Sequence, residues 1–349
     1  MKRIDKIILS LLAVLLVVVV LNLLLPKGIA GLKAGNETTQ KPDTSGTSAD
    51  TIPSVSNTTP ATTPVPTTTP VPTTTKAPDP VITVNPVEIN PGDYFTVYVK
   101  NAKVTDQVKF ETDITGDKIK TIPYNDGLLA LVPVSYFTKP GDFSINVKVD
   151  RDGETVAEKT ENLTLLNKKF PSSYVKVTEE QAATRTDEKV LASDGEHTSK
   201  ARSNSPAEPL WKDDFIKPLE GTMAAEFGFI RYVNNVMIGR HSGLDICTEA
   251  GVPIIASNSG KVVLAMELII TGNTVIIDHG MDVFTAYSHC SKLLVSVGDM
   301  VERGDIIAEV GSTGFSTGDH LHWTVTIGST FVDPWLFVGK NPLDFIKLD

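Results

Sequence analysis

The chain has 349 residues and a formal net charge of −10, and 41% of its residues are hydrophobic. This length allows two or three domains, and the acidic balance argues against nucleic acid as a partner. Two cysteines are too few for a disulfide scaffold, which excludes a small fold stapled by several bridges.

The N-terminus has the features of a membrane anchor. Three basic residues precede an apolar run from Ile7 to Leu25, close to the ~20 residues that a helix needs to cross the bilayer. Because basic flanks stay in the cytoplasm, residues 1–26 predict a cytoplasmic tip and a transmembrane helix, with the rest of the chain outside the cell membrane. A cleaved signal peptide is the alternative, with small residues at Gly28 and Ala30, although the apolar stretch of such peptides usually has only about 7–15 residues.

Residues 27–80 are rich in threonine, proline, serine and alanine, and they repeat the sequence Pro-Val-Pro-Thr-Thr-Thr from Pro64 and from Pro70. Such a composition cannot bury enough apolar surface to offset the chain entropy lost on folding. We therefore expect a disordered stalk that lifts the following domains off the membrane. A passive linker without a length requirement is equally consistent with the composition.

Residues 81–167 predict a small immunoglobulin-like β-sandwich. Alternating, β-branched or aromatic residues occur at 94–99, 107–110 and 143–149, and turn signals separate these runs. The segment has no cysteine and no catalytic cluster, so we expect a spacer or a module that contacts the wall or a protein partner. Residues 168–210 are polar and predict a connector with a short helix near Glu179 to Thr184.

The chain after residue 240 contains five of the six histidines: His241, His279, His289, His320 and His322. Neutral imidazole is a good zinc ligand, so this clustering favours a zinc site. On a flat strand, His241 and Asp245 would sit ~13 Å apart, too far to bind one ion. They can share an ion only if the chain bends between them, and Gly243 supplies that freedom.

His320 and His322 precede β-branched residues that predict a strand. Residues i and i+2 of a strand project to the same side about 6–7 Å apart, which suits one metal ligand and one nearby catalytic group. The glycine-rich loop from Gly311 to Asp319 is not a phosphate-binding loop, because no lysine follows in the required register. His289 ends an alternating stretch and is expected at a strand end that faces a cleft.

From roughly Trp211 to Phe345 the chain resembles the lysostaphin-type zinc endopeptidases, also called LytM-domain proteins. The resemblance implies a largely antiparallel β-fold with an open groove in residues 211–349. The matching positions, in chain order, are Phe227-Gly228, His241-x-Gly243-x-Asp245, Gly251-x-Pro253, Ala256, Gly260, Asn273 to His279, Tyr287-x-His289, Val297-Gly298, Gly304, Gly311-x-Thr313-Gly314-x-Ser316-Thr317-Gly318 and His320-x-His322.

The resemblance also implies roles for individual residues. The positions matching His241, Asp245 and His322 hold Zn²⁺ in that family, and those matching His289 and His320 flank the fourth zinc position, where water and substrate bind. Three protein ligands with an open fourth position are typical of catalytic zinc. His289 and His320 would orient the water and transfer protons, because the chain has no H-E-x-x-H glutamate for this task.

Several neighbouring residues are expected to have structural roles. His279 is expected to cap a turn, and His197 to lie on the solvated surface of the connector. Asn234 or Asn235 falls near an additional, inhibitory zinc ligand of some relatives, but that role is not assigned here because no occluding pro-segment is evident.

Cys247 and Cys290 leave three alternatives open: buried free thiols, a bridge between the two, or zinc ligation.

The sequence as a whole predicts a mostly β, membrane-anchored zinc endopeptidase that hydrolyses peptide bonds in bacterial peptidoglycan. The alternative is a non-catalytic module of an envelope or sporulation assembly, or an activator of another wall hydrolase. Loss of a ligand or of a catalytic histidine usually marks such modules, and this chain keeps all five positions.

Overall fold

The computed structural model describes residues 77–346, which belong to one compact unit of the chain. Strands dominate this part, with two α-helices and one short 3-10 helix among the described residues, so the prediction of a mostly β protein is confirmed. The predicted membrane helix and residues 27–76 of the stalk lie outside the described residues. Between residues 77 and 346, no helix has both the length and the apolar character needed to cross a membrane.

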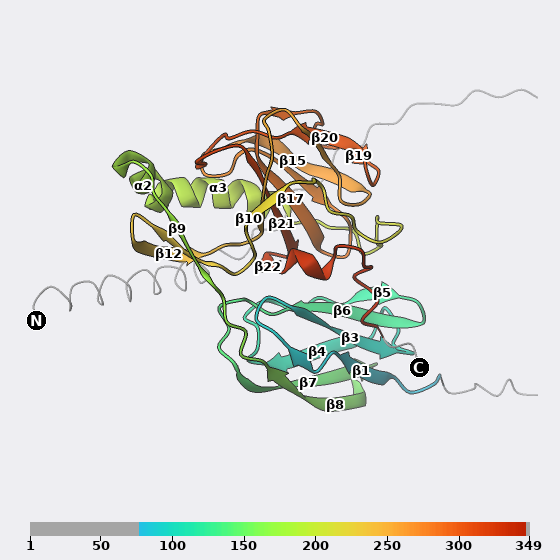
Figure 1. Ribbon diagram of the computed structural model, residues 1–349. Coiled ribbons are helices and arrows are strands. Elements are labelled where there is room, and N and C mark those ends of the chain that lie inside the picture. The colour runs from blue at the N-terminus through green and yellow to red at the C-terminus, as the bar shows by residue number, and fades with distance from the viewer. Residues whose placement is uncertain (1–76, 347–349) are drawn as a thin grey trace, which may run out of the picture. The chain divides into compact units, whose positions relative to one another are not determined.

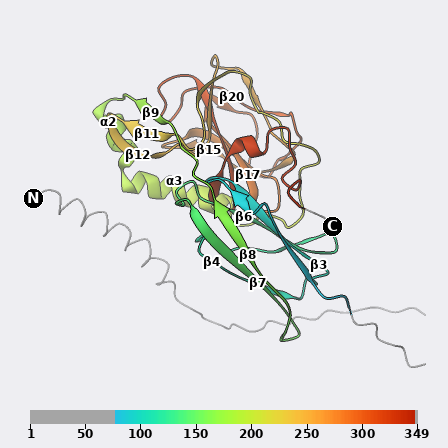
Figure 2. The same ribbon diagram turned by 60° about the horizontal axis from the view of Figure 1, so that its bottom comes forward.

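The first eight strands form two four-stranded sheets, coloured blue to green in Figure 1. Their orders are β1-β3-β6-β5 and β2-β8-β7-β4, and Figure 2 shows the long β7 and β8 side by side. Both sheets contribute apolar side chains to one core, for example Val97 and Val147. The immunoglobulin-like topology stays a prediction. The strands are β1 (Val81–Asn85), β2 (Glu88–Ile89), β3 (Tyr94–Lys100), β4 (Gln107–Thr112), β5 (Ile122–Tyr124), β6 (Gly127–Pro133), β7 (Gly141–Arg151) and β8 (Glu154–Leu165).

The connector contains β9 (Ser172–Val175), α2 (Glu179–Thr186) and α3 (Glu188–Ala201). The predicted short helix corresponds to α2, which begins at a capping box formed by Thr178 and Gln181. Helix α3 was not predicted, because it buries no residue and its sequence has no apolar face that would reveal it.

The remaining strands build a second β-structure around an eight-stranded sheet. Its order is β10-β13-β21-β17-β16-β15-β19, with β22 beside β21, and every pairing in it is antiparallel. Two three-stranded sheets, β12-β11-β9 and β14-β20-β18, lie outside this order. The elements are β10 (Thr222–Ala225), β11 (Ile230–Val233), β12 (Val236–Arg240), β13 (Leu244–Cys247), β14 (Pro253–Ile255), β15 (Gly260–Leu268), β16 (Gly272–Asp278), β17 (Val283–Cys290), β18 (Lys292–Leu293), β19 (Met300–Val301), β20 (Ile306–Glu309), β21 (His320–Ile327), β22 (Thr330–Val332) and the 3-10 helix η1 (Pro334–Leu336).

The two β-structures are joined by direct contacts. The Tyr94 hydroxyl donates to the carbonyl of Pro342 at 3.0 Å, and the Tyr94 ring packs edge-on against Phe345 with 5.2 Å between centroids. The backbone N–H of Asp333 donates to the carbonyl of Gly92 at 2.8 Å. One apolar cluster includes residues of both parts, so strands β1–β8 are packed against the C-terminal part rather than tethered to it.

Gly243 is required by a close approach of two strands. A Cβ atom at this position would overlap the backbone carbonyl oxygen of Trp323 on β21. The residue has no left-handed φ angle, so its importance lies in the missing side chain rather than in the bending freedom expected from the sequence.

We expect Gly243→Ala to destabilise the protein by about 1–3 kcal/mol, because β13 and β21 must separate to admit the methyl group. The matched control is Gly116→Ala, where an added Cβ meets no atom within 4 Å. Denaturant unfolding of both variants and the wild type measures the difference. Equal stability of the two variants would contradict the claim that the close approach of the strands requires glycine at position 243.

His279 is buried directly after β16 and takes part in a chain of hydrogen bonds. Its Nδ1 lies 2.8 Å from the carbonyl of Ser259, and its Nε2 lies 2.8 Å from the Thr285 hydroxyl. The hydroxyl of Tyr287 lies 3.0 Å from that of Thr285 and accepts the backbone N–H of Ser257. Burial lowers the pKa of His279 to about 4, so the imidazole is neutral at pH 7. The residue therefore has a structural role, as expected, but the prediction that it caps the turn is wrong, because the Asp278 carboxylate accepts the backbone N–H of Gly280 there.

His279 should make folding stability depend on pH. Because its pKa when folded lies below the ordinary 6.5, the unfolded chain binds a proton first, and stability falls as the pH drops from about 6.5 toward 4. Between pH 7 and pH 5 we expect the wild type to lose roughly 2 kcal/mol more than His279→Gln. Denaturant unfolding at both pH values measures this, with the exposed His197 changed to Gln as the control. An identical loss in wild type and His279→Gln would refute the prediction.

Candidate metal centre

Three potential metal ligands converge between neighbouring strands. Asp245 on β13 is paired with His322 on β21, and His241 lies between β12 and β13. The Asp245 Oδ1 atom is 2.8 Å from His241 Nε2 and 2.7 Å from His322 Nδ1, and the two imidazole nitrogens are 3.0 Å apart. The structure thus brings together the three residues that the resemblance indicated as zinc ligands.

The outer nitrogens of both imidazoles are also engaged. The Nδ1 atom of His241 lies 2.9 Å from the carbonyl of Glu226, to which it donates, and this leaves Nε2 free to face Asp245. The Nε2 atom of His322 lies 3.2 Å from the Ser242 hydroxyl, so that Nδ1 faces the cluster. Partners of this kind fix the tautomer and ring orientation of metal-binding histidines.

The arrangement fits a single zinc ion. Tetrahedral zinc with bonds of about 2 Å needs ligand atoms roughly 3.3 Å apart. The three atoms found here are slightly closer, and each of the three residues offers one atom within 4.8 Å of the others. Two imidazole nitrogens and one carboxylate oxygen are a donor set that suits zinc, and a small outward movement of each residue would make room for the ion.

Two further imidazoles lie beside this cluster. His289, at the end of β17, and His320, at the start of β21, have ring centroids 4.7 Å apart. Each donates its Nδ1 proton to a backbone carbonyl at 2.8 Å, His289 to Thr313 and His320 to Gly318. Their Nε2 atoms are therefore left as acceptors, and that of His320 lies 3.8 Å from Asp245 Oδ1.

The orientation of His289 depends on an irregularity in β17. The pairing of β16 with β17 shifts register between Asn273 and Val275, and His289 has a φ angle of 64°. A register shift of this kind re-aims a side chain, and left-handed backbone at a non-glycine residue persists only where the surrounding structure holds it. Sequence alternation alone could not predict this detail.

The charges of the site follow from burial and hydrogen bonding. Burial would raise the pKa of Asp245, but its short contacts with the imidazoles of His241 and His322 hold that pKa well below its usual range. Burial lowers the pKa of His322 to about 4. Burial, together with the neighbouring His322 and His320, lowers the pKa of His289 to about 3. A carboxylate beside neutral imidazoles is the state that metal binding requires.

Arg231 is a site residue that sequence reasoning missed. Its Nη2 atom on β11 donates to Asp245 Oδ2 at 2.8 Å, the oxygen that the imidazoles leave free. The only available signal was a charged residue in a short strand shortly after Phe227-Gly228, and its spacing to Asp245 gives no hint of contact.

Other residues singled out in the sequence lie outside the cluster. Asn234 binds the connector, since its side chain forms two 3.0 Å hydrogen bonds with the backbone of Val177. His197 is exposed on α3. Cys247 and Cys290 are free thiols, and burial raises the pKa of both, that of Cys290 to about 12. Of the three alternatives, the structure has free, protonated thiols.

Comparison with known proteins finds the same region. The model of peptidase family M23 matches residues 239–334. Peptidoglycan DD-endopeptidase ShyB of Vibrio cholerae is 39% identical over 109 residues, which are 31% of this chain and 23% of that protein. The DD-carboxypeptidase/endopeptidase Mpg of Neisseria meningitidis is 38% identical over 120 residues, 34% of this chain and 28% of that protein. The chain thus spans about a quarter of the length of these relatives.

A solved structure extends the likeness. The crystal structure of a putative peptidase M23 from Pseudomonas aeruginosa has a TM-score of 0.51 and 25% identity, covering 71% of this chain and 94% of that one. That coverage exceeds residues 239–334, so the likeness includes elements before the family match. With these matches, the C-terminal part of the chain belongs to peptidase family M23.

Proposed function

We propose that this protein is a zinc endopeptidase that hydrolyses peptide bonds in the stems or cross-bridges of bacterial peptidoglycan. The observation that supports it most is the meeting of five side chains: His241, Asp245 and His322 as ligands, and His289 and His320 beside them. A non-catalytic member of the family would have no need to keep all five.

The residues have complementary tasks in this proposal. When bound by His241, Asp245 and His322, zinc supplies Lewis acidity that polarises a carbonyl group and lowers the pKa of a water molecule. The Nε2 atoms of His289 and His320 are acceptors because both Nδ1 protons are committed to backbone carbonyls. One Nε2 can take a proton from water, and a proton returned from the same pair can reach the leaving amine.

The substrate class and location rest on the relatives and on the N-terminus. Relatives named as peptidoglycan DD-endopeptidases support a wall peptide as substrate. The apolar run from Ile7 to Leu25 supports a single membrane anchor with the bulk of the chain outside the cytoplasm. Strands β1–β8 would then act as a spacer or as a module that contacts the wall or a protein partner.

Hydrolysis can be tested on purified wall material. The full chain with zinc is expected to release new amino groups from peptidoglycan, and His289→Ala to reduce the rate by 10²–10⁴, since general acid–base groups contribute about that much. Amine labelling and mass spectrometry of the fragments measure the rate and identify the bond that is cut.

The control for this test is His197→Ala, an exposed histidine on α3 that should leave the rate unchanged. If the wild type releases nothing from several peptidoglycan types while binding zinc, the catalytic proposal is wrong, and the scaffold or activator role replaces it.

Metal content separates ligands from catalytic residues. After dialysis, Asp245→Asn and His322→Ala are expected to retain less than a tenth of the zinc of the wild type, because each loses one of three ligands. His320→Ala should keep close to one zinc per chain. Elemental analysis measures this, and thermal unfolding provides a second readout, since zinc at a hundred times its Kd would stabilise a competent site by about 2.7 kcal/mol. Stoichiometric zinc in His322→Ala would contradict the ligand assignment.

A further inference from the structure

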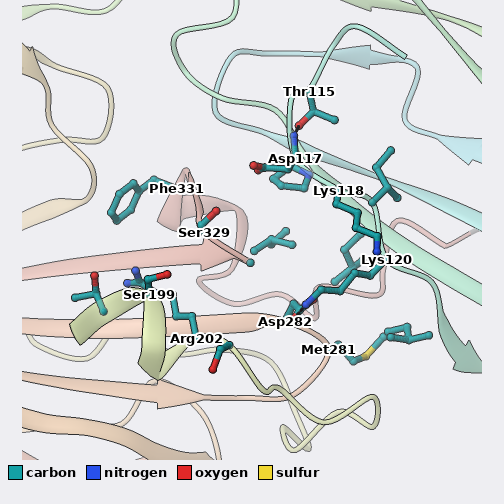
Figure 3. A pocket seen from close by; sticks show the side chains of 18 of the residues that line it. Thr115, Asp117, Lys118, Lys120, Ser199, Arg202, Met281, Asp282, Ser329 and Phe331 are labelled. Carbon is teal, nitrogen blue, oxygen red and sulfur yellow. Dashed lines mark hydrogen bonds and ion pairs between the residues drawn. The ribbon is translucent and has the colours of Figure 1, made fainter. Parts of the chain in front are cut away.

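A cavity of about 520 Å³ lies away from the metal centre, where the loop between β4 and β5, the end of α3, the residues after β16 and the turn after β21 meet (Figure 3). This volume is typical of sites for small ligands. Ile327 lines it, five residues along β21 from His322. That spacing is roughly 17 Å in an extended strand, so a small ligand in the cavity would not touch the metal ligands.

The cavity has a partly buried cation without a counter-ion. Arg202, at the C-terminal end of α3, lines it, and its Nε atom is sealed from solvent without a hydrogen-bond partner. Its guanidinium pairs with no carboxylate among residues 77–346, and it lies over the ring of Phe331, 5.8 Å from the ring centroid. Burial lowers the pKa of Arg202 to about 10. A desolvated, unpaired guanidinium is costly unless an anion binds to it.

The other charges at the cavity are mostly neutralised or exposed. Lys120 forms an ion pair with Asp282 at 2.8 Å, drawn as a dashed line in Figure 3. Asp117 accepts a hydrogen bond from the Thr330 hydroxyl, and Lys118 is exposed to solvent. The cavity therefore has one partly buried and unpaired positive group, Arg202, with two carboxylates nearby.

The remaining walls are apolar or carry hydroxyl groups. Apolar side chains come from both β-structures, among them Ile122, Leu131, Met281, Ile327 and Phe331. Hydroxyl groups of Ser199 and Ser329 lie between them. Such walls suit a ligand with a small apolar body and few hydrogen-bonding groups.

We propose that this cavity binds the free C-terminal carboxylate of a short peptide with small apolar side chains, with Arg202 as the anchoring residue. Guanidinium and carboxylate form paired, parallel hydrogen bonds, and a bound carboxylate would give Arg202 the counter-ion that it lacks. The nearby Asp117 and Asp282 disfavour a multiply charged phosphate, and they can accept hydrogen bonds from the amide or amino groups of a peptide. The proposal is independent of hydrolysis at the metal centre.

Calorimetric titration of the full chain tests this proposal. The probes are alanyl-alanine in its L,L and D,D forms, the corresponding C-terminal amides, and inorganic phosphate. We expect at least one dipeptide acid to bind and its amide to bind at least tenfold more weakly. The Arg202→Gln substitution should weaken the binding of the acid by a similar factor. Lys200→Gln is the matched control, because it removes one charge from the same helix outside the cavity and should bind as the wild type does.

Two further variants keep the outcome unambiguous. The His322→Ala protein should bind the dipeptide normally, and loss of binding there would place the ligand in the metal centre and overturn the proposal. The ligand-free Arg202→Gln protein should unfold at the wild-type temperature or above it, since it loses an unpaired and partly buried charge, while the dipeptide no longer raises that temperature. Equal binding of phosphate and dipeptide, or no binding of either dipeptide acid, would also overturn the proposal.

Discussion

The antiparallel register of β13, β21 and β17 is the constraint on which the site depends. Asp245 is paired with His322, and His322 with Ser288, so the three strands present their polar residues at one level of the sheet. Leu244 and Trp323, the alternating neighbours, belong to the apolar core. Side chains of a strand alternate between its two faces, so a shift of one residue in the pairing would turn every side chain of the shifted strand to the other face. Such a shift of β21 would put the Trp323 indole in place of the His322 imidazole, and a shift of β13 would turn the Asp245 carboxylate into the core. The core that fixes the register therefore also fixes the metal ligands.

Burial then sets the chemistry of the side chains that the register assembles. Burial lowers the pKa of His289 and of His322, so these two imidazoles stay neutral, and the contacts with His241 and His322 keep Asp245 ionised. The two oxygens of this carboxylate have separate partners: Oδ1 faces the imidazoles, and Oδ2 is held by Arg231. This division leaves the carboxylate little freedom to rotate. Arg231 thus orients a candidate metal ligand, and outer partners of this kind tune metal sites.

The parts of the protein that the sequence predicted well are those set by residue type and local spacing. The strands around residues 94–99 and 143–149 follow from alternation, and α2 follows from local helix signals. The grouping of His241, Asp245 and His322 followed from a family pattern.

Three features of the sites could not be predicted without the tertiary structure. Arg231 reaches Asp245 across a hairpin, His289 is aimed by a register shift, and Arg202 lines a cavity formed by segments far apart in the chain. Each depends on distant contacts that no local spacing encodes.

The connector, residues 168–210, illustrates the same limit. Its polar composition indicated a segment between domains, but its contacts make it part of the fold around the metal centre. Strand β9 pairs in parallel with β11, the strand that contains Arg231. The carboxylate of Asp194 on α3 accepts the backbone N–H groups of Ile269 and Ile270, and the guanidinium of Arg185 on α2 lies 6.0 Å from the ring of Phe315 in the glycine-rich loop. A domain boundary at residue 211 would leave β11 without one of its two neighbours, and backbone groups at a free strand edge lose their partners. The structural unit around the metal centre therefore begins within the connector, at or before Ser172, and extends well beyond the residues that match the family.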